Sequence, residues 1–182
     1  MDNNELKREA DLLIQQCSLA ELLATYANWF IGGSYSYDLM CWRDLDIYVL
    51  DPVHALKQCF EVGYELTRRL AAKKSFFTNN IGGEPNGLYW GIRLGDPRQG
   101  AWKLDVWFLD EEGYRQHAAY SGDMRAKLTA DNKEVILTIK EYYWQKATYR
   151  NEVTSEMIYR AVIEDGVRSI SEFEGRLKGD AA

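Results

Sequence analysis

Two aspartates stand two residues apart at the start of an apolar segment that has the pattern of a β-strand. Asp44 and Asp46 alternate with apolar residues, and a period of two places both carboxylates on the same face of a strand. Two like charges side by side destabilise each other unless a cation lies between them. Because carboxylate oxygens suit a hard divalent ion such as Mg²⁺, the pair predicts a magnesium site.

Two further elements could complete this site. Upstream, Gly33-Ser34 ends an apolar stretch, where a glycine lets backbone N–H groups approach an anion and the serine hydroxyl adds a donor. Downstream, Asp105 interrupts the apolar run over residues 102–108. A charge buried in such a strand needs a partner, which the first two carboxylates and their metal would provide.

Basic residues near these acidic groups are further candidates. Lys103 precedes Asp105 by two residues on the same strand face. It could contact a nucleotide phosphate, which is the role we assign to it, or form a structural salt bridge. Arg43 and Arg93 are weaker candidates. Neither of the two histidines has the spacing of a metal ligand.

Apolar periodicity predicts the elements that must position these side chains. Asp51-Pro52 supplies an N-cap oxygen and then a proline at the first helical position, so a helix should follow at once, with Val53 and Leu56 among its buried residues. Asp131 and Glu134 have the spacing of a capping box. The expected elements are a helix over 4–26, strands at 29–31, 45–50, 88–94 and 101–109, helical periodicity after about residue 123, and a continuous final helix carrying the apolar stripe 159–177.

This order of elements predicts an α/β (α+β) fold, a sheet domain flanked by helices with a helical C-terminal part. We place the sheet domain at residues 1–125 and a C-terminal helical segment packed on it at residues 126–182. Most of the acidic excess of the chain falls in the first part. The carboxylates proposed to bind metal therefore lie in the acidic half of the sequence.

The combined motif resembles the DNA polymerase beta-like nucleotidyltransferase superfamily. Gly33-Ser34 is followed, after nine intervening residues, by Asp44-x-Asp46 and later by a strand carrying Asp105. The resemblance covers roughly residues 25–110 and is specific because three elements agree in order, spacing and expected secondary structure. It implies a small mixed sheet flanked by helices.

The resemblance also implies roles for these residues. Asp44 and Asp46 would ligate two Mg²⁺ ions, Asp105 would join one ion and act as general base, and Gly33 with Ser34 would hold the phosphates of a nucleoside triphosphate. Many members carry a glycine four residues after the motif serine, where this chain has Asp38. That departure predicts a change in the shape of the phosphate loop or in its nucleotide affinity.

Composition excludes several other classes of protein. The chain has 182 residues, of which 22 are basic and 28 acidic, for a formal net charge of −6. This charge argues against binding to duplex DNA. No apolar run reaches the ~18 residues of a membrane span. The odd number of cysteines, three, favours a reducing, cytoplasmic location over a disulfide framework.

The function predicted from sequence is Mg²⁺-dependent transfer of a nucleoside monophosphate, AMP from ATP, to a hydroxyl of an unidentified acceptor. A cationic small molecule such as an aminoglycoside-like or lincosamide-like antibiotic fits an acidic site. The alternatives are a non-catalytic module of the same fold that binds a nucleotide or a protein, and a single-strand RNA-binding module, which the charge disfavours. A homodimer is left open.

Overall fold

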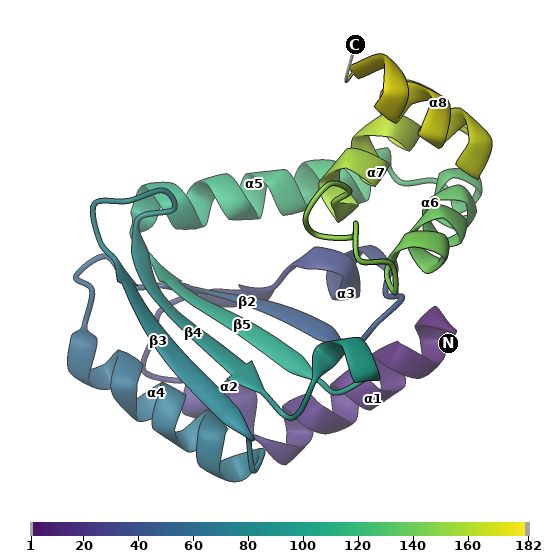
Figure 1. The fold of residues 1–182 in the computed structure, drawn as a ribbon. Coiled ribbons are helices and arrows are strands. Elements are labelled where there is room, and N and C mark those ends of the chain that lie inside the picture. Colours follow the sequence, from purple (N-terminus) through teal and green to yellow (C-terminus); the bar gives the residue numbers. More distant parts are fainter. Residues whose placement is uncertain (1, 181–182) are drawn as a thin grey trace. The chain divides into compact units, whose positions relative to one another are not determined.

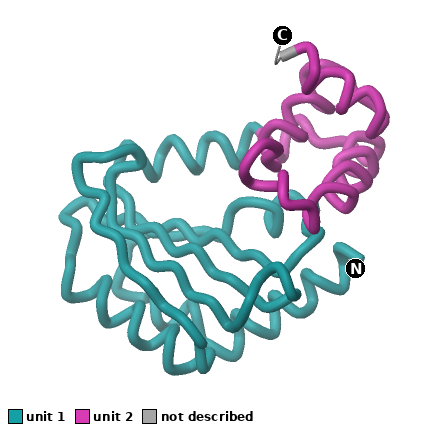
Figure 2. The backbone as a smooth tube through the Cα atoms, viewed as in Figure 1, with its two compact units in different colours: residues 1–123 teal, residues 124–182 magenta. Residues whose placement is uncertain are grey.

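The computed structural model describes residues 2–180, which form two compact units. One unit extends to Asp123 and the other begins at Met124 (Figure 2). Within residues 2–180, no helix combines the length and the apolar character needed to cross a membrane.

The first unit is built on a five-stranded sheet. The sheet is mixed, as the sequence predicted. The strand order is β1-β2-β5-β4-β3, and β2 pairs in parallel with β5 while every other pair is antiparallel. One of these strands, β3, was not predicted. The strands are β1 (Trp29–Ile31), β2 (Asp44–Leu50), β3 (Lys74–Asn80), β4 (Gly87–Arg93) and β5 (Lys103–Leu109).

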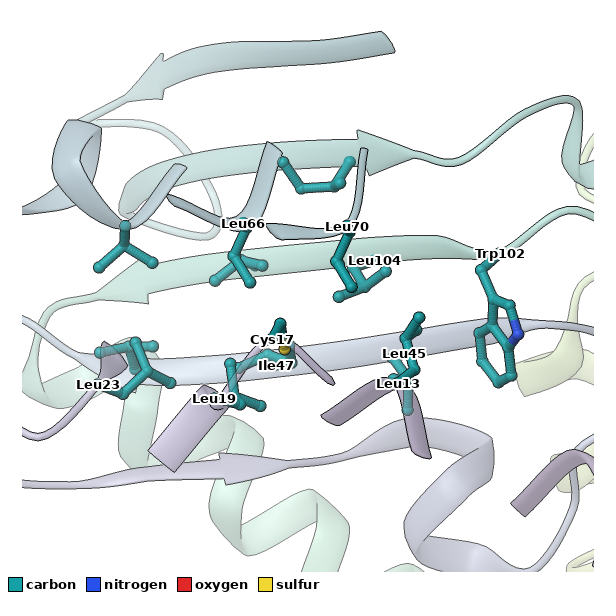
Figure 3. Close-up of a cluster of buried hydrophobic side chains, with 14 of the residues drawn as sticks. Leu13, Cys17, Leu19, Leu23, Leu45, Ile47, Leu66, Leu70, Trp102 and Leu104 are labelled. Carbon is teal, nitrogen blue, oxygen red and sulfur yellow. The ribbon is translucent and has the colours of Figure 1, made fainter. Parts of the chain in front are cut away.

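One face of the sheet is covered by α1 (Asn3–Gln16), α2 (Leu19–Leu22) and α4 (Leu56–Arg69) (Figure 1). Every second residue of β2 and β5 points into this layer and is fully buried. Figure 3 shows these strand residues with side chains from the covering helices. The buried residues labelled there are Leu13, Cys17, Leu19, Leu23, Leu45, Ile47, Leu66, Leu70, Trp102 and Leu104.

Two sequence predictions about these helices were wrong in detail. The first helix ends at Gln16 instead of continuing to residue 26, because Ser18 adopts a left-handed conformation with φ 49° before α2 starts. The second does not begin directly after Pro52. The Asp51 carboxylate accepts a hydrogen bond from the Ala55 N–H at 2.8 Å, which closes the turn that precedes the helix, and the helix starts at Leu56.

The turn before α4 exposes two residues that were expected to be buried. Val53 is 80% exposed and Leu56 is 50% exposed. Cys59, Leu66 and Leu70, which continue the apolar spacing of the same segment, are buried. The helical periodicity was therefore correct from the second turn onward.

The other face of the sheet carries α3 (Gly33–Tyr37) and α5 (Glu111–Lys127) (Figure 1). Ring contacts attach α5 to the sheet: His117 stacks on Tyr48 with centroids 4.5 Å apart, and Tyr114 meets Phe30 at 5.4 Å. The sequence predicted a loop in place of α3 and placed the start of α5 too late. A 3₁₀ turn (η1, Pro97–Gln99) joins β4 to β5.

The second unit contains α6 (Ala130–Tyr143), α7 (Ser155–Ile163) and α8 (Ile170–Asp180), with α6 in contact with both of the others. Its capping box is formed by Thr129 and Asn132, not by the predicted pair of acidic residues. The expected continuous final helix is divided into α7 and α8. Between them Gly166 has φ 72°, which a helix cannot contain.

Candidate metal and nucleotide site

The parallel pairing of β2 with β5 brings the three predicted carboxylates together. Asp46 is paired with Asp105 in the register, and Asp44 with Lys103. One carboxylate oxygen from each of Asp44, Asp46 and Asp105 lies within 4.8 Å of the other two. Because the alternate residues of both strands fill the core beneath, these side chains are directed to the opposite face of the sheet.

The Lys103 ammonium lies within this group of carboxylates. Its Nζ is 2.6 Å from Asp44 Oδ1 and 2.5 Å from Asp105 Oδ2, and the residue is only 2% exposed. The ring of Trp42 lies 5.1 Å from the same nitrogen. Burial alone would lower the pKa of Lys103, but the surrounding carboxylates raise it above its usual value. The side chain is therefore a charged cation held by two aspartates.

Asp105 has two further partners, both from β4. Its Oδ1 accepts a hydrogen bond from the Tyr89 hydroxyl at 2.7 Å and lies 2.9 Å from Arg93 Nη2. Burial by itself would raise the pKa of Asp105, but Lys103 and Arg93 hold it below the usual range. Burial, together with the nearby Asp105 carboxylate, raises the pKa of Tyr89 to about 12. Asp105 is consequently an ionised carboxylate and a weak base while these contacts persist.

The contribution of β4 was largely missed from the sequence. Arg93 was only a weak candidate, and Tyr89 was not considered. The antiparallel register places Gly91 opposite Asp105, so Tyr89 and Arg93, two residues to either side, share its face. The sequence predicted residues 88–94 and 101–109 as two antiparallel strands, which the structure confirms, but it did not predict the register that places Tyr89 and Arg93 beside Asp105.

The turn after β1 approaches the site through Gly33. This residue has φ 58°, and a Cβ added to it would lie 2.1 Å from Asp46 Oδ2. The Gly32 N–H also donates to the Asp46 carbonyl at 2.8 Å. A glycine is required at position 33 both by the left-handed backbone and by the close approach of the carboxylate.

Ser34 follows in the first turn of α3 and is 8% exposed. At the other end of this short helix, Asp38 has φ 59° and forms an ion pair with Lys7. Aspartate is among the residues that tolerate the left-handed region. The backbone of Asp38 is therefore in a conformation that a glycine at this position would adopt without strain.

The other candidates are held elsewhere in the first unit. Arg43 makes a two-pronged pair with Glu9, at 2.6 and 2.8 Å, and donates to the Gly100 carbonyl. His54 lies in the turn before α4 with φ 48°, and His117 stacks on Tyr48. Arg43 thus holds Glu9 and the backbone of Gly100. Neither histidine belongs to the group of carboxylates that could hold a metal ion.

The residues present fit a divalent ion. Three carboxylates from two adjacent strands offer hard oxygen donors within a few ångströms of each other, which is the donor chemistry that Mg²⁺ prefers. Because Gly33 has no side chain, the Asp46 carboxylate can lie directly against its backbone and beside the other two aspartates. These features support the predicted metal ligands Asp44, Asp46 and Asp105, and we retain them as the proposed set.

The sheet carries an Asp-x-Asp pair on β2, a third aspartate on its parallel neighbour β5, and a glycine-serine turn beside them. This is the arrangement that the sequence resemblance led us to expect. Comparison with solved structures confirms the predicted fold, a mixed sheet flanked by helices. No protein-family model and no curated protein sequence matches the chain.

Three structurally similar proteins illustrate the relationship. A mutant of the Cid1 poly(U) polymerase bound to MgATP has a TM-score of 0.63 at 16% identity, covering 89% of this chain and 50% of that one. A cytoplasmic RNA terminal U-transferase has a TM-score of 0.58 at 16% identity, covering 89% and 47%. Terminal uridylyl transferase 4 from Trypanosoma brucei with bound UPU has a TM-score of 0.56 at 12% identity, covering 84% and 52%. The chain therefore spans about half the length of these proteins.

Proposed function

We propose that this protein is a Mg²⁺-dependent nucleotidyltransferase that moves AMP from ATP to a hydroxyl of a small-molecule acceptor and releases pyrophosphate. The observation that carries the proposal is the convergence of Asp44, Asp46 and Asp105 on the face of the mixed sheet opposite the layer of α1, α2 and α4. The similar structures support nucleotidyl transfer as the reaction class, since they include terminal uridylyl transferases and a poly(U) polymerase.

Each residue of the site has a role in this proposal. The three aspartates would hold Mg²⁺, two ions when nucleotide is bound, and such ions stabilise the attacking and leaving oxygens of an in-line displacement. Gly33 and Ser34 would contact the nucleotide phosphates. The acceptor oxygen forms a bond to the α-phosphorus while the bond to pyrophosphate breaks. Asp105 takes the proton of the hydroxyl, which requires that its contact with Lys103 be released first.

A cationic acceptor fits the charge of the site. Three carboxylates there face two cations, Lys103 and Arg93, and the whole chain has a formal charge of −6. An excess of negative charge attracts positively charged substrates. An amine-bearing molecule with free hydroxyl groups, such as an aminoglycoside-like antibiotic, is therefore the acceptor class that we would test first.

A transfer assay tests the proposal. The protein is incubated with Mg²⁺, α-labelled ATP or UTP, and a panel of hydroxylated amines, and wild type is compared with Asp46→Asn. We expect label transfer that depends on Mg²⁺ and is lost in the variant. Equal transfer by both proteins would exclude the metal assignment. Metal-dependent ATP binding without transfer to any acceptor would favour a non-catalytic nucleotide-binding module.

Transfer of UMP to an RNA end is a second candidate function, favoured by a specific feature of the open sheet face. Three aromatic rings lie in a row beside Asp105: Trp107 and Tyr89 have centroids 4.7 Å apart, and Tyr89 and Phe76 are 5.8 Å apart. Phe76 is 37% exposed. Aromatic side chains on a sheet face can stack on the bases of single strands. Adding short RNA oligonucleotides to the acceptor panel, with each nucleotide in turn, separates this function from the first.

A further inference from the structure

Lys103 occupies the space between two of the carboxylates that the proposed function assigns to metal. Its Nζ is 2.6 Å from Asp44 Oδ1 and 2.5 Å from Asp105 Oδ2. Lys103 pairs directly with Asp44 in the register of β2 and β5, and it precedes Asp105 by two residues on the same face. The pairing of the two strands therefore fixes the backbone from which Lys103 reaches both carboxylates, and its position does not depend on a loop.

The contacts of Asp105 leave little room for a second cation beside the ammonium. Its Oδ1 already contacts the Tyr89 hydroxyl and Arg93 Nη2, at 2.7 and 2.9 Å, and its Oδ2 contacts Lys103. A Mg²⁺ ligand oxygen lies only ~2.0–2.1 Å from the ion. An ion that bound Asp44 Oδ1 and Asp105 Oδ2 would take the space of the Lys103 ammonium, and the two positive charges would repel each other strongly at that separation.

We propose that Lys103 is an internal counter-cation of the carboxylate site and competes with a divalent ion for Asp44 and Asp105. The proposal rests on the metal assignment made under the proposed function. While the ammonium is in place, it neutralises carboxylates that would otherwise repel each other. An ion that takes both carboxylates displaces it, which also removes one of the cations that make Asp105 a weak base. The affinity of the site for divalent ions is thus set by an exchange of cations.

A titration of the unmodified protein tests the exchange directly. The side-chain amine nitrogens of lysine are followed by ¹⁵N NMR while Mg²⁺ is added without nucleotide, and Lys103→Arg assigns the signal. We expect the Lys103 resonance to shift as Mg²⁺ binds, while that of Lys57, on the exposed side of α4 with 85% of its side chain accessible, stays in place. An unchanged Lys103 signal at Mg²⁺ concentrations that saturate binding in calorimetry would overturn the proposal.

Removal of the competing charge provides a second test. Lys103→Met keeps a long apolar side chain without the ammonium, and Lys57→Met makes the same change at an exposed position. Binding is measured with Mn²⁺, whose free form is counted by electron paramagnetic resonance. We expect Lys103→Met to bind Mn²⁺ more tightly than wild type by a factor of about ten or more, because unit charges at this distance interact by several RT.

The outcomes separate this proposal from the transferase itself, since neither measurement needs a nucleotide or an acceptor. Mn²⁺ binding by Lys103→Met that is equal to or weaker than that of wild type and Lys57→Met would overturn the competition. If Lys103→Met fails to fold, as judged by circular dichroism, the NMR titration of wild type decides. Cation exchange without label transfer to any acceptor would keep the assignment of Lys103 and reject the proposed reaction.

Discussion

Gly33→Ala tests the connection between the glycine turn and the carboxylate site. The backbone of Gly33 has φ 58°, and the new Cβ would lie 2.1 Å from Asp46 Oδ2 and 3.1 Å from its Cγ. Ordinary nonbonded contacts of carbon are ~3.5 Å, so the carboxylate or the turn must move by roughly 1 Å. If Asp46 is a metal ligand, this displacement falls on the site itself.

Two effects of this substitution can be given magnitudes. The left-handed backbone costs an alanine about 1–2 kcal/mol, which for a chain of this size lowers Tm by about 2–8 °C. Misplacing a catalytic group by about 1 Å costs on the order of 10²-fold in rate. We therefore expect a modest loss of stability in thermal melts and a large loss of Mg²⁺-dependent label transfer.

Gly82→Ala is the matched control for this experiment. Gly82 has φ 80°, and no atom lies within 4 Å of a Cβ placed there. The control should lose similar stability and keep full transfer. If Gly33→Ala transfers label and binds Mg²⁺ as well as Gly82→Ala does, the placement of Asp46 in the site is refuted. Equal losses in both variants would assign the effect to stability alone.

Three further predictions concern packing, the β4 contacts and pH. Gly63→Ala should lower the free energy of unfolding by about 1–3 kcal/mol in urea denaturation, because its Cβ would lie 2.3 Å from the indole of Trp90 in the core. Tyr89→Phe removes the hydrogen bond to the charged Asp105 and should cost about 1.5–3 kcal/mol in the same assay, whereas an unchanged midpoint would show that water replaces it. The neighbouring Arg68 and Arg69 lower the pKa of Glu65 to about 2. The ionised Glu65 therefore stabilises the protein above the usual pKa of glutamate, and this stabilisation is lost as pH falls toward 2. Glu65→Gln should lower the free energy of unfolding at pH 7 but not near pH 2. An NMR titration of the Glu65 carboxyl should show a midpoint of about 2.

The residues of the site that lie close together in the sequence could be predicted, because the spacing within a single strand determines which side chains share a face. A period of two within an apolar run places Asp44 and Asp46 on one face, and the same rule places Lys103 and Asp105 together. Both strands are recognised by the apolar residues that surround these charged positions. Gly33 was identified by its type and position, and the structure shows why, since its left-handed φ and its distance from Asp46 both exclude a side chain.

The parts that were missed depend on contacts distant in sequence. Nothing within β4 shows that its Gly91 pairs with Asp105, so the approach of Tyr89 and Arg93 could not be predicted. The edge strand β3 has exposed or half-buried residues and lacks the apolar run that marks a central strand. The break at Ser18 was also invisible, because helical periodicity continues across a residue that leaves the helix.

The same non-local pairing changes the interpretation of the acidic charge. From sequence alone, a metal was the expected counter-charge of the three carboxylates, with a salt bridge from Lys103 as an alternative. The structure supplies two cations, one from the same strand as Asp105 and one from its antiparallel neighbour, so the carboxylates are largely balanced by Lys103 and Arg93. The acidic group is then stable without an ion. Metal binding must therefore be judged by its competition with these cations, not inferred from the excess of negative charge.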